Sequence, residues 1–586
     1  MIEVETSPNR ATSFRQTEHT LALPDGGELF YRVWLPSMRA KKALLLFHRG
    51  HEHSARWQQT VEALALDDVA VFAWDARGHG RSSGERGSAV NLSMLVKDVD
   101  DFVRHVSERY GIATEDMIVM AHSVGAVIVA AWVHDYAPPI RALILATPAF
   151  RVKLYFPFAV TLLRLRQKLL GPGYVKSYVK ARMLTHDLEE ARRYQDDEFI
   201  FRQIAVNVLL DLHDTSTRLL SDAGAITVPT LMVSAGSDWI VKLGAQQKFL
   251  EGLSSHSKQL LIFRGFHHAV FHEKDRRRLI AVLREFMLKQ FQRPNGHASL
   301  LDADEHGYTR AEYDCLRRER RVSYAAMRFA LKTVGRLSAG IRLGWRTGFD
   351  SGMTLDYVYD NRPQGVTPLG CSIDRAYLNS VGWRGIRQRR NHLQKTLRNA
   401  ILATHAAGRP VRIFDVASGP GRYILQTMQE LRHIPITAVL CDYKTENLDA
   451  ARRLARELGL ENVITLQGDA FDRASLAAAV PRSTIGIVSG LYELFPGNRQ
   501  VLESLYGLTD AIEPEGHLIY TNQPWHPQLN FIAGVLTNRE GKPWRMRRRT
   551  QAEMDELVRA AGFVKSSQEI DRWGIFTVSA ARRIRT

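Results

Sequence analysis

Short runs of β-branched and other apolar residues alternate with helical patterns from about Thr17 to Gln292. After a hairpin-like LALPDGGELFYRVWLP, the runs are ALLLFHRG, VAVFAWD, MIVMAHS, ALILATP, TLMVSAG and QLLIFRG. Strands that alternate with helices favour a mostly parallel sheet with helices on both faces. In such sheets the chemistry lies at the carboxyl ends of the strands, which is where the polar candidates of this half occur.

The same alternation begins again near Val411, with new residues. PVRIFDVASGPGRYILQTMQEL indicates a strand, a glycine-containing turn and a helix, and further strands follow in ITAVLCDY, NVITLQGDAFD, TIGIVSGLYELF and HLIYTNQPW. The segments FVKSSQEI and GIFTVSAARR close the series. Because 586 residues are also too many for one hydrophobic core, we expect two α/β domains.

The breaker cluster Arg293-Pro294-Asn295-Gly296-His297 is the best first boundary between them. We expect a first domain at 1–292, a helical connector at 293–373 and a second domain at 374–586. Within the first domain, residues 148–214 interrupt the strand order with helical, basic and aromatic segments.

The composition, with 45% hydrophobic and 24% charged residues, is that of a soluble multidomain protein. MIEVETSPNR at the start does not resemble a secretory signal, and no run of about 18 apolar residues predicts a membrane span. Cys315, Cys371 and Cys441 match neither a disulfide framework nor a zinc pattern. We therefore expect a cytoplasmic protein without a metal site.

The net charge of +17 indicates a cationic surface, whose natural partners are nucleic acid, anionic lipid or acidic substrates. Residues 136–186 and 321–346 contain no acidic side chain. A continuous helix over 321–346 would gather six basic side chains within an arc of about 120°: Arg321, Arg328, Lys332, Arg336, Arg342 and Arg346. That pattern is typical of an interfacial helix, although an ordinary surface helix produces it too. The basic segments alternate with aliphatic residues rather than stacking aromatics, which favours an anionic membrane over nucleic acid.

Three residues in the first half have the types and order of a catalytic triad. A serine nucleophile needs a base to take its proton, a carboxylate to orient that base, and N–H donors for the oxyanion. Ser123, Asp238 and a histidine follow predicted strands in the order Ser, Asp, His. Spacing alone leaves His267 and His268 as alternatives. Ala121 stands where the nucleophile motif G-x-S-x-G has its first glycine.

HRGHEHSARW, DARGHGRSSGERG, AHSVGA, AGSDWIV and GFHHAVFHE resemble the monoacylglycerol lipase and lysophospholipase branch of the α/β hydrolases, over nearly the whole first half. The resemblance implies an α/β-hydrolase fold with a helical lid at about 148–214. It also implies Asp238 as the acid and His268 as the base, and the backbone N–H groups of Gly50 and Val124 as oxyanion donors.

The loop that holds Gly50 departs from the pattern of this family. Arg49 and His51 stand where the pattern His-Gly-x-Gly-Glu-His-Ser has glycines. His48, His51 and His53 could also be interpreted as metal ligands, but no cysteine or carboxylate set completes a zinc site. A hydrolase-like module that has lost its activity is therefore an alternative to a working enzyme.

The second half contains the signs of a nucleotide site. Gly419 and Gly421 allow close backbone approach at a helix N-terminus, and Asp415 ends the strand before them. Ile424 replaces the third glycine of the dinucleotide fingerprint, which disfavours NAD. Asp442, at the end of the next strand, can accept hydrogen bonds from ribose hydroxyls, and Asp469 can accept from an adenine amino group.

These residues resemble the motifs of class I methyltransferases that bind S-adenosylmethionine, over about 374–581. The resemblance implies a Rossmann-like fold, Asp415-x-Ala417-x-Gly419-x-Gly421 as the first motif, Asp442 as the ribose acid and Asp469 in the adenine motif. Tyr492 and Glu493 follow the fourth strand, where this fold meets its acceptor, although Tyr492 could equally be a packing residue.

The two halves together resemble a group of bacterial bifunctional fusions. We expect a serine ester hydrolase acting on a monoacylglycerol or lysophospholipid, fused to a methyltransferase of unassigned acceptor and working in lipid metabolism. The expected location is the cytoplasm, either free or bound peripherally to the inner face of the membrane. The alternative is a silent hydrolase-like binding module attached to an active small-molecule or RNA methyltransferase.

Overall fold

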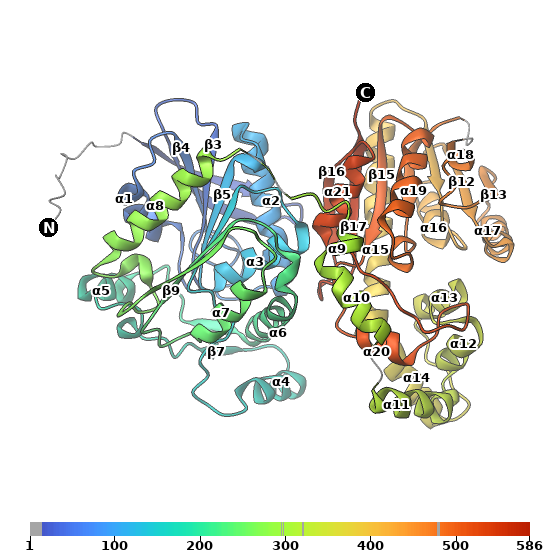
Figure 1. Cartoon of the computed structure of the whole chain (residues 1–586), viewed down its shortest axis with the longest axis horizontal. Coiled ribbons are helices and arrows are strands. Elements are labelled where there is room, and N and C mark those ends of the chain that lie inside the picture. Colours follow the sequence, from blue (N-terminus) through green and yellow to red (C-terminus); the bar gives the residue numbers. More distant parts are fainter. Residues whose placement is uncertain (1–13, 295, 297, 319–320, 478–480, 586) are drawn as a thin grey trace. The chain divides into compact units, whose positions relative to one another are not determined.

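A computed structural model describes residues 14–294, 296, 298–318, 321–477 and 481–585. The chain divides into two compact units between Ala298 and Ser299, each built on its own sheet (Figure 1). The division falls just after the breaker cluster, of which Asn295 and His297 lie outside the described residues, as does the segment 1–13.

The sheet of the first unit has eight strands in the order β1-β2-β4-β3-β5-β6-β9-β10. β1 and β2 form an antiparallel hairpin, β2 is antiparallel to β4, and the other strands are parallel. The strands are β1 (Arg15–Ala22), β2 (Glu28–Leu35), β3 (Lys42–Phe47), β4 (Val69–Trp74), β5 (Met117–His122), β6 (Ala142–Ala146), β9 (Thr230–Ala235) and β10 (Lys258–Phe263). The central strands are buried along their length because helices cover both faces of a parallel sheet.

Alternate residues of β3 face opposite layers of helices. Leu44 and Leu46 belong to a core that includes Leu283 of α8, whereas Phe47 contacts Phe102 of α2, with ring centroids 6.1 Å apart. The helices of these two layers are α1 (Gln58–Leu64) and α8 (Arg276–Gln292) on one face, and α2 (Leu92–Tyr110), α3 (Val124–Tyr136) and α7 (Leu243–Gly252) on the other.

The segment between β6 and β9 forms a separate layer of helices and a small two-stranded sheet, as the sequence predicts for the lid region. Its elements are α4 (Ala159–Leu170), β7 (Tyr174–Lys176), α5 (Leu188–Asp196), β8 (Gln203–Ala205) and α6 (Val206–Asp222). β7 pairs with β8, and α6 packs on α3. α4 has no buried residue.

The sheet of the second unit has seven strands in the order β13-β12-β11-β14-β15-β17-β16. All neighbours are parallel except β17, which is antiparallel to β15 and β16. The strands are β11 (Val411–Asp415), β12 (Ile436–Asp442), β13 (Val463–Gln467), β14 (Ser483–Val488), β15 (Ile512–Asn522), β16 (Phe563–Ile570) and β17 (Thr577–Arg583). The strand order reverses at β11, so a crevice is expected outside the ends of β11 and β14.

Helices cover both faces of this sheet. α15 (Val381–Ala406), α16 (Arg422–Glu430) and α17 (Thr445–Glu457) pack on one face. α18 (Arg473–Ala477), α19 (Asn498–Ala511) and α21 (Gln551–Ala560) pack on the other. The sequence-based fold class, an α/β-hydrolase unit with a helical lid followed by a Rossmann-like methyltransferase unit, is confirmed.

The helices predicted as a connector belong to the second unit. They are α9 (Ala303–His306), α10 (Tyr308–Arg318), α11 (Val322–Lys332), η6 (Val334–Leu337), α12 (Ala339–Thr347), α13 (Gly352–Asp360) and α14 (Pro368–Leu378). With the start of α15 and with α20 (Leu529–Val535) they enclose a core of their own. None of the described helices combines the length and apolar character that a bilayer crossing requires.

The single basic helix expected at 321–346 is two helices with a 3₁₀ turn between them. Thr333, at φ −105° and ψ −89°, ends α11, and Ser338 caps α12 by accepting from the N–H of Ile341. A Cβ on Gly340 would lie 2.7 Å from both Tyr357 and Tyr377, so close packing explains the glycine. The continuous basic arc therefore does not form.

Candidate active sites

Ser123 occupies a sharp turn between β5 and α3. Its backbone has φ 56° and ψ −112°, a conformation that costs a residue other than glycine free energy and is typical of a nucleophile elbow. A Cβ on Gly125 would lie 2.3 Å from the carbonyl oxygen of His48, so this position requires glycine. Ala121 is buried in β5, paired with Phe47 and Leu145, and its methyl group is accommodated.

The three predicted catalytic side chains form one hydrogen-bonded line. Nε2 of His268 is 2.7 Å from Oγ of Ser123, and Nδ1 of His268 is 2.8 Å from Oδ2 of Asp238. With Nδ1 protonated, His268 donates to Asp238 and accepts from the serine hydroxyl. All three are buried. His267 instead stacks on His186, with ring centroids 3.7 Å apart, so the geometry selects His268.

Asp238 is held in its ionised form. Burial alone would raise its pKa, but the attraction of His268 and the N–H groups of Val241 and Ile240 outweigh that effect and lower the pKa. The Ile240 and Val241 N–H groups donate to Oδ1 at 2.7 and 3.0 Å. A carboxylate fixed in this way can orient His268 and stabilise its protonated form.

The predicted oxyanion donors lie side by side. A Cβ on Gly50 would come within 3.2 Å of Cγ2 of Val124, which places the loop after β3 against the start of α3. His51 adopts φ 68°, a conformation that favours glycine and explains the glycine of the family pattern at this position.

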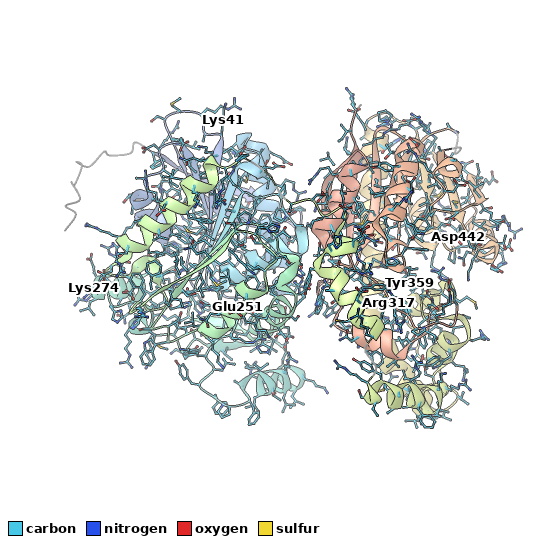
Figure 2. All side chains as sticks on the ribbon, in the orientation of Figure 1. Lys41, Glu251, Lys274, Arg317, Tyr359 and Asp442 are labelled. Carbon is cyan, nitrogen blue, oxygen red and sulfur yellow. The ribbon has the colours of Figure 1, made fainter. Side chains whose placement is uncertain are left out.

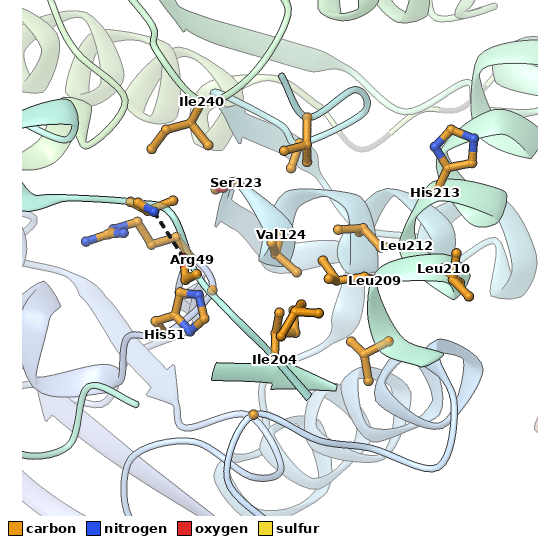
Figure 3. A pocket seen from close by; sticks show the side chains of 18 of the residues that line it. Arg49, His51, Ser123, Val124, Ile204, Leu209, Leu210, Leu212, His213 and Ile240 are labelled. Carbon is orange, nitrogen blue, oxygen red and sulfur yellow. Dashed lines mark hydrogen bonds between the residues drawn. The ribbon is translucent and has the colours of Figure 1, made fainter. Parts of the chain in front are cut away.

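Arg49 is turned into the protein interior beside the lid. Its Nη2 is 2.9 Å from Oε1 of Glu52, and its guanidinium lies over the ring of Tyr194 in α5, 4.8 Å from the centroid. Figure 3 shows Arg49 and His51 on one side of Val124, and Leu209, Leu212 and His213 on the other. The departures from the family pattern therefore tie the oxyanion loop to the lid.

The other histidines of this loop bind protein groups. Nε2 of His48 accepts from the N–H of Ala76 at 2.9 Å and Nδ1 donates to the carbonyl of Arg49 at 2.7 Å, while Nε2 of His53 lies 2.9 Å from Oδ2 of Asp197. Among the described residues, one group has metal-ligand geometry, and its members are His186, His267 and Glu273. Oε1 of Glu273 already accepts from the N–H of His267 at 2.7 Å.

A cavity of about 700 Å³ opens over Ser123 and His268. Its wall is mostly apolar, and much of it comes from the lid, with Phe156, Leu162 and Val179 among the contributors. Such a cavity suits an apolar chain that ends at the serine.

The glycine turn of the second unit lies at its predicted place. Gly419 and Gly421 have φ 55° and 64°, and Gly421 is the N-cap of α16. A Cβ on Gly421 would lie 2.6 Å from Cδ1 of Leu440. Oδ2 of Asp442 accepts from the N–H of Gly419 at 2.8 Å, and Oδ1 accepts from the N–H of Lys444 at 2.8 Å. Asp442 thus organises the turn as well as facing the cleft.

Asp415 is fully buried beneath this turn. Burial raises its pKa to about 7, and the nearby charge of Asp442 also raises it, whereas the Tyr423 hydroxyl and the Ala417 N–H oppose the change. Both of those groups donate to its carboxylate. Asp415 therefore changes charge near neutral pH.

A cleft of about 730 Å³ lies at the carboxyl ends of β11, β12 and β14. Ala417, Gly419, Gly421, Asp442 and Asp469 line it, and Figure 2 labels Asp442 and another lining residue, Tyr359. The cleft is within the usual range of about 300–1,000 Å³ for small-molecule sites. A glycine turn with acids after two adjacent strands fits an adenosyl group.

The two predicted acceptor residues have different surroundings. The hydroxyl of Tyr492 donates to Oγ of Ser504 at 2.9 Å, and Tyr492 belongs to the core against α19, which is the packing role. Glu493 lines a second, smaller cavity, where Oε1 accepts from Nη1 of Arg389 at 3.1 Å. Arg389 was not predictable from the sequence, because α15 lies far from Glu493 along the chain and no motif marks it.

Comparison with known proteins agrees with these two units. A family model described as "Serine aminopeptidase, S33" matches residues 38–275, and one described as "Putative methyltransferase" matches residues 283–583. The chain is 47% identical to the uncharacterized protein YnbC of Escherichia coli K12, over 97% of this chain and 98% of that protein.

The first half is similar to lipases. It is 26% identical to a monoacylglycerol lipase of Mycolicibacterium smegmatis and 27% identical to the human monoglyceride lipase, covering 45% and 46% of this chain and 94% and 89% of those proteins. A solved soluble variant of monoglyceride lipase from Saccharomyces cerevisiae is 17% identical, with a TM-score of 0.43, covering 49% of this chain and 99% of that one. The chain therefore belongs to the putative methyltransferase family, as a fusion in which an α/β-hydrolase domain similar to monoglyceride lipases precedes the methyltransferase domain.

Proposed function

We propose that the chain is a bifunctional enzyme: a serine hydrolase of a lipid ester, either a monoacylglycerol or a lysophospholipid, and an S-adenosylmethionine-dependent methyltransferase. The observation that supports the first activity best is the line Asp238–His268–Ser123, which ends at the apolar cavity. The departures from the family pattern at Arg49 and His51 in the oxyanion loop leave Gly50 beside Val124, which favours a working site over a silent module.

In this mechanism Oγ of Ser123 attacks the ester carbonyl while Nε2 of His268 takes the serine proton. Asp238 stabilises the histidine cation that forms, and the N–H groups of Gly50 and Val124 donate to the oxyanion. His268 then returns the proton to the departing alkoxide. Water, activated by the same histidine, hydrolyses the acyl-enzyme and frees Ser123.

The lid supports a lipid substrate and an anionic membrane as the place where it is met. Leu169 and Leu170 of α4 are 70% and 75% exposed, and Lys168, the residue before them, is exposed as well. Apolar side chains with adjacent cations bind anionic lipid surfaces by burial and by charge. We place the enzyme peripherally on the cytoplasmic face of the membrane.

In the second unit, Asp442 would hold the ribose of S-adenosylmethionine, Asp469 the adenine, and the Gly419–Gly421 turn the remainder of the molecule. The bound cofactor supplies an activated methyl group. The protein's part is to position an acceptor beside it, since alignment provides much of the rate in such a transfer.

Ser123→Ala tests the hydrolase. Hydrolysis of a short soluble ester should fall by about 10³-fold or more, because the nucleophile is lost, and labelling by a fluorophosphonate should stop. Ser372→Ala, at an exposed serine of α14, is the matched control and should keep both. A Ser123→Ala protein that hydrolyses the ester as fast as its parent would refute the mechanism. A parent that never reacts with the probe would favour the silent module.

Asp442→Ala tests the cofactor. Calorimetry with S-adenosylhomocysteine should show binding to the parent and about 10- to 100-fold weaker binding to the variant, as expected for lost hydrogen bonds to a charged group. Asp449→Ala removes an exposed carboxylate of α17 and should bind like the parent. Equal affinities for all three proteins would exclude Asp442 from the site.

A further inference from the structure

The smaller cavity of the second unit, which we call the chamber, adjoins the cofactor cleft. Its volume is about 340 Å³. Residues that line both spaces include Leu355, Arg389, Gly490, Leu494 and Trp544. The chamber and the cleft are therefore neighbouring cavities with part of their lining in common.

One end of the chamber is apolar and comes from the helices before the sheet. Leu331 of α11, Ile341 of α12 and Ile373 of α14 line it. Trp383 of α15 and Trp544 add two stacked rings with an interplanar angle of 27°. An apolar or aromatic body of modest size fits such a lining.

The other end is polar and lies at the carboxyl ends of β14 and β15. Gly490 and Glu493 follow β14, and Gln523 and His526 follow β15. Chemistry in an open α/β sheet is found at this edge. The polar end of the chamber is thus the end where a reacting atom is expected.

Several polar atoms of the lining have no partner among the described residues. They include Oε2 of Glu493, Nε2 of Gln523, Nε1 of Trp544 and Nε of Arg389. Buried polar atoms are nearly always hydrogen-bonded, so several such atoms around one cavity indicate a ligand that supplies the partners. Glu493 keeps a salt bridge to Arg389 through Oε1 and has Oε2 left to accept.

The charges around Glu493 narrow the kind of ligand. Arg389 is the cation of the pair, and its charge is already balanced by Glu493, while its Nε keeps a hydrogen to donate. The free carboxylate oxygen accepts an O–H or N–H but repels an anion. His526 is held neutral, since burial lowers its pKa to about 4, and it offers no charge to a carboxylate ligand.

We propose that the chamber binds the methyl acceptor, and that this acceptor is a small apolar molecule with one hydroxyl or amino group, which donates to Glu493. The proposal rests on the methyltransferase function proposed above. Glu493 and Gln523 position the donor group at the cleft, and the helices α11, α12 and α14 select the body by size and shape.

Four probes with the same apolar body test this. Calorimetry uses 1-naphthol, 1-naphthylamine, 1-naphthoate and naphthalene with the full chain, after a fluorophosphonate has blocked Ser123. The hydroxyl and amino probes should bind the parent at least about tenfold more tightly than naphthoate, because a buried carboxylate disfavours an anion. The relative affinity of the first two separates alcohol from amine acceptors.

Two variants assign the binding to the chamber. Ala376→Trp fills part of the chamber from an exposed position of α14, and Ala403→Trp places the same side chain on an exposed part of α15 that does not line it. Binding of 1-naphthol should weaken about tenfold or more in the first variant only. Glu493→Gln should weaken the binding of 1-naphthol and strengthen the binding of 1-naphthoate.

Binding of S-adenosylhomocysteine is measured on the same samples, so the two proposals fail in different ways. If S-adenosylhomocysteine binds but the probes are insensitive to Ala376→Trp, the chamber proposal is overturned alone. If the probes respond as expected but S-adenosylhomocysteine does not bind, the chamber is a ligand site and the methyltransferase function is overturned. Preference for naphthoate in the parent would also overturn the role of Glu493.

Discussion

Ser123 is flanked by two positions where its motif normally has glycine, and the structure distinguishes them. Gly125 approaches the carbonyl of His48 at the end of β3, and a methyl group there would meet backbone that cannot move without shifting the oxyanion loop. Ala121 lies in the strand itself, where an alanine side chain is part of normal packing. The motif therefore tolerates change on one side only.

Gly125→Ala should lower ester hydrolysis by about 10²-fold and destabilise the first unit by about 1–3 kcal/mol. The added methyl group would displace the oxyanion loop after β3 and the turn that holds Ser123. Gly244→Ala, at a helical glycine with nothing within 4 Å, is the control and should be neutral or stabilising by up to about 1 kcal/mol. Rates and urea unfolding of the two variants check this. Unchanged hydrolysis in Gly125→Ala would show that the loop adapts.

Restoring glycine at the other position should bring no gain. Ala121→Gly should leave the rate within a fewfold of the parent and cost about 1 kcal/mol of stability, since glycine weakens a strand. The same two measurements check it. A large rise in rate would mean that the alanine methyl group hinders the nucleophile.

The predicted site residues show where sequence reasoning reaches its limit. Order and strand context were enough to name Ser123, Asp238 and, with family resemblance, His268, and the three side chains meet in the structure. The contacts of Arg49 with the lid were not predictable, because they depend on how distant segments pack. The same holds for Arg389, whose meeting with Glu493 follows from the position of α15 on the sheet.

At the scale of elements, α4 has the most unusual surroundings in the first unit. It has no buried residue, its Leu165, Leu169 and Leu170 do not line the cavity, and Phe158 before it is 81% exposed. An exposed apolar patch of this kind marks an interaction surface. The sequence predicted a lid here but could not say which of its helices would remain uncovered.

The double variant Leu169→Glu, Leu170→Glu should reduce flotation with anionic vesicles about tenfold or more, because burial of two leucines is replaced by charge repulsion. Neither residue lines the cavity, so hydrolysis of a soluble ester should not change. Leu188→Glu changes a leucine of α5 that is 71% exposed and serves as the control. Equal flotation of the double variant and parent would remove α4 from the membrane contact.

The break between α11 and α12 shows how packing overrides periodicity. Arg328, counted in the predicted basic arc, donates to the carbonyls of Gly534 and Val535 at the end of α20, and Lys332 lies over the ring of Trp345. The guanidinium of Arg328 is thus engaged at a helix end, whereas Lys332 stays exposed beside its aromatic partner. A helical-wheel pattern cannot distinguish these uses from an interfacial face.

At the scale of the whole molecule, net charge overstates the basic surface. Arg547, Arg548 and Arg549 are buried, and their partners include Glu553, Glu312 and the carbonyl of Tyr492. The two α/β plans, by contrast, were predictable, since alternation of strand and helix is a local signal. The packing of helices 303–378 with the second unit was not, because its contacts join residues far apart in the chain.

Because the two units have separate cores, we expect two thermal transitions. S-adenosylhomocysteine should raise the midpoint temperature of one of them. In the first unit burial lowers the pKa of His51 and His272 to about 4 and of His79 to about 3. The unfolded chain, with histidine pKa values of about 6.5, binds more protons in this range, so stability is present above pH ~6.5 and is lost as pH falls toward 4.

The stability of the second unit should depend less on pH, because the titration of Asp415 acts in the opposite direction to that of the buried histidines of this unit. The raised pKa of Asp415, about 7, gives stability at low pH that is lost as pH rises from about 4 to 7. Scanning calorimetry at pH 7 and 5 should therefore show the ligand-independent transition moving down further than the ligand-dependent one. His51→Gln should reduce that movement; the opposite order of shifts would contradict the assignment.

The helix α15 belongs to two cores at once. Its first turns form a wall of the chamber through Trp383 and Ile386, and its later turns anchor the sheet through Leu397 and Ile401. Substitutions in α15 disturb both cores, so most members of a library made there would be unfolded. Libraries confined to the chamber-facing positions of α11, α12 and α14 should change which ligands the chamber binds while the lining of the neighbouring cleft stays intact.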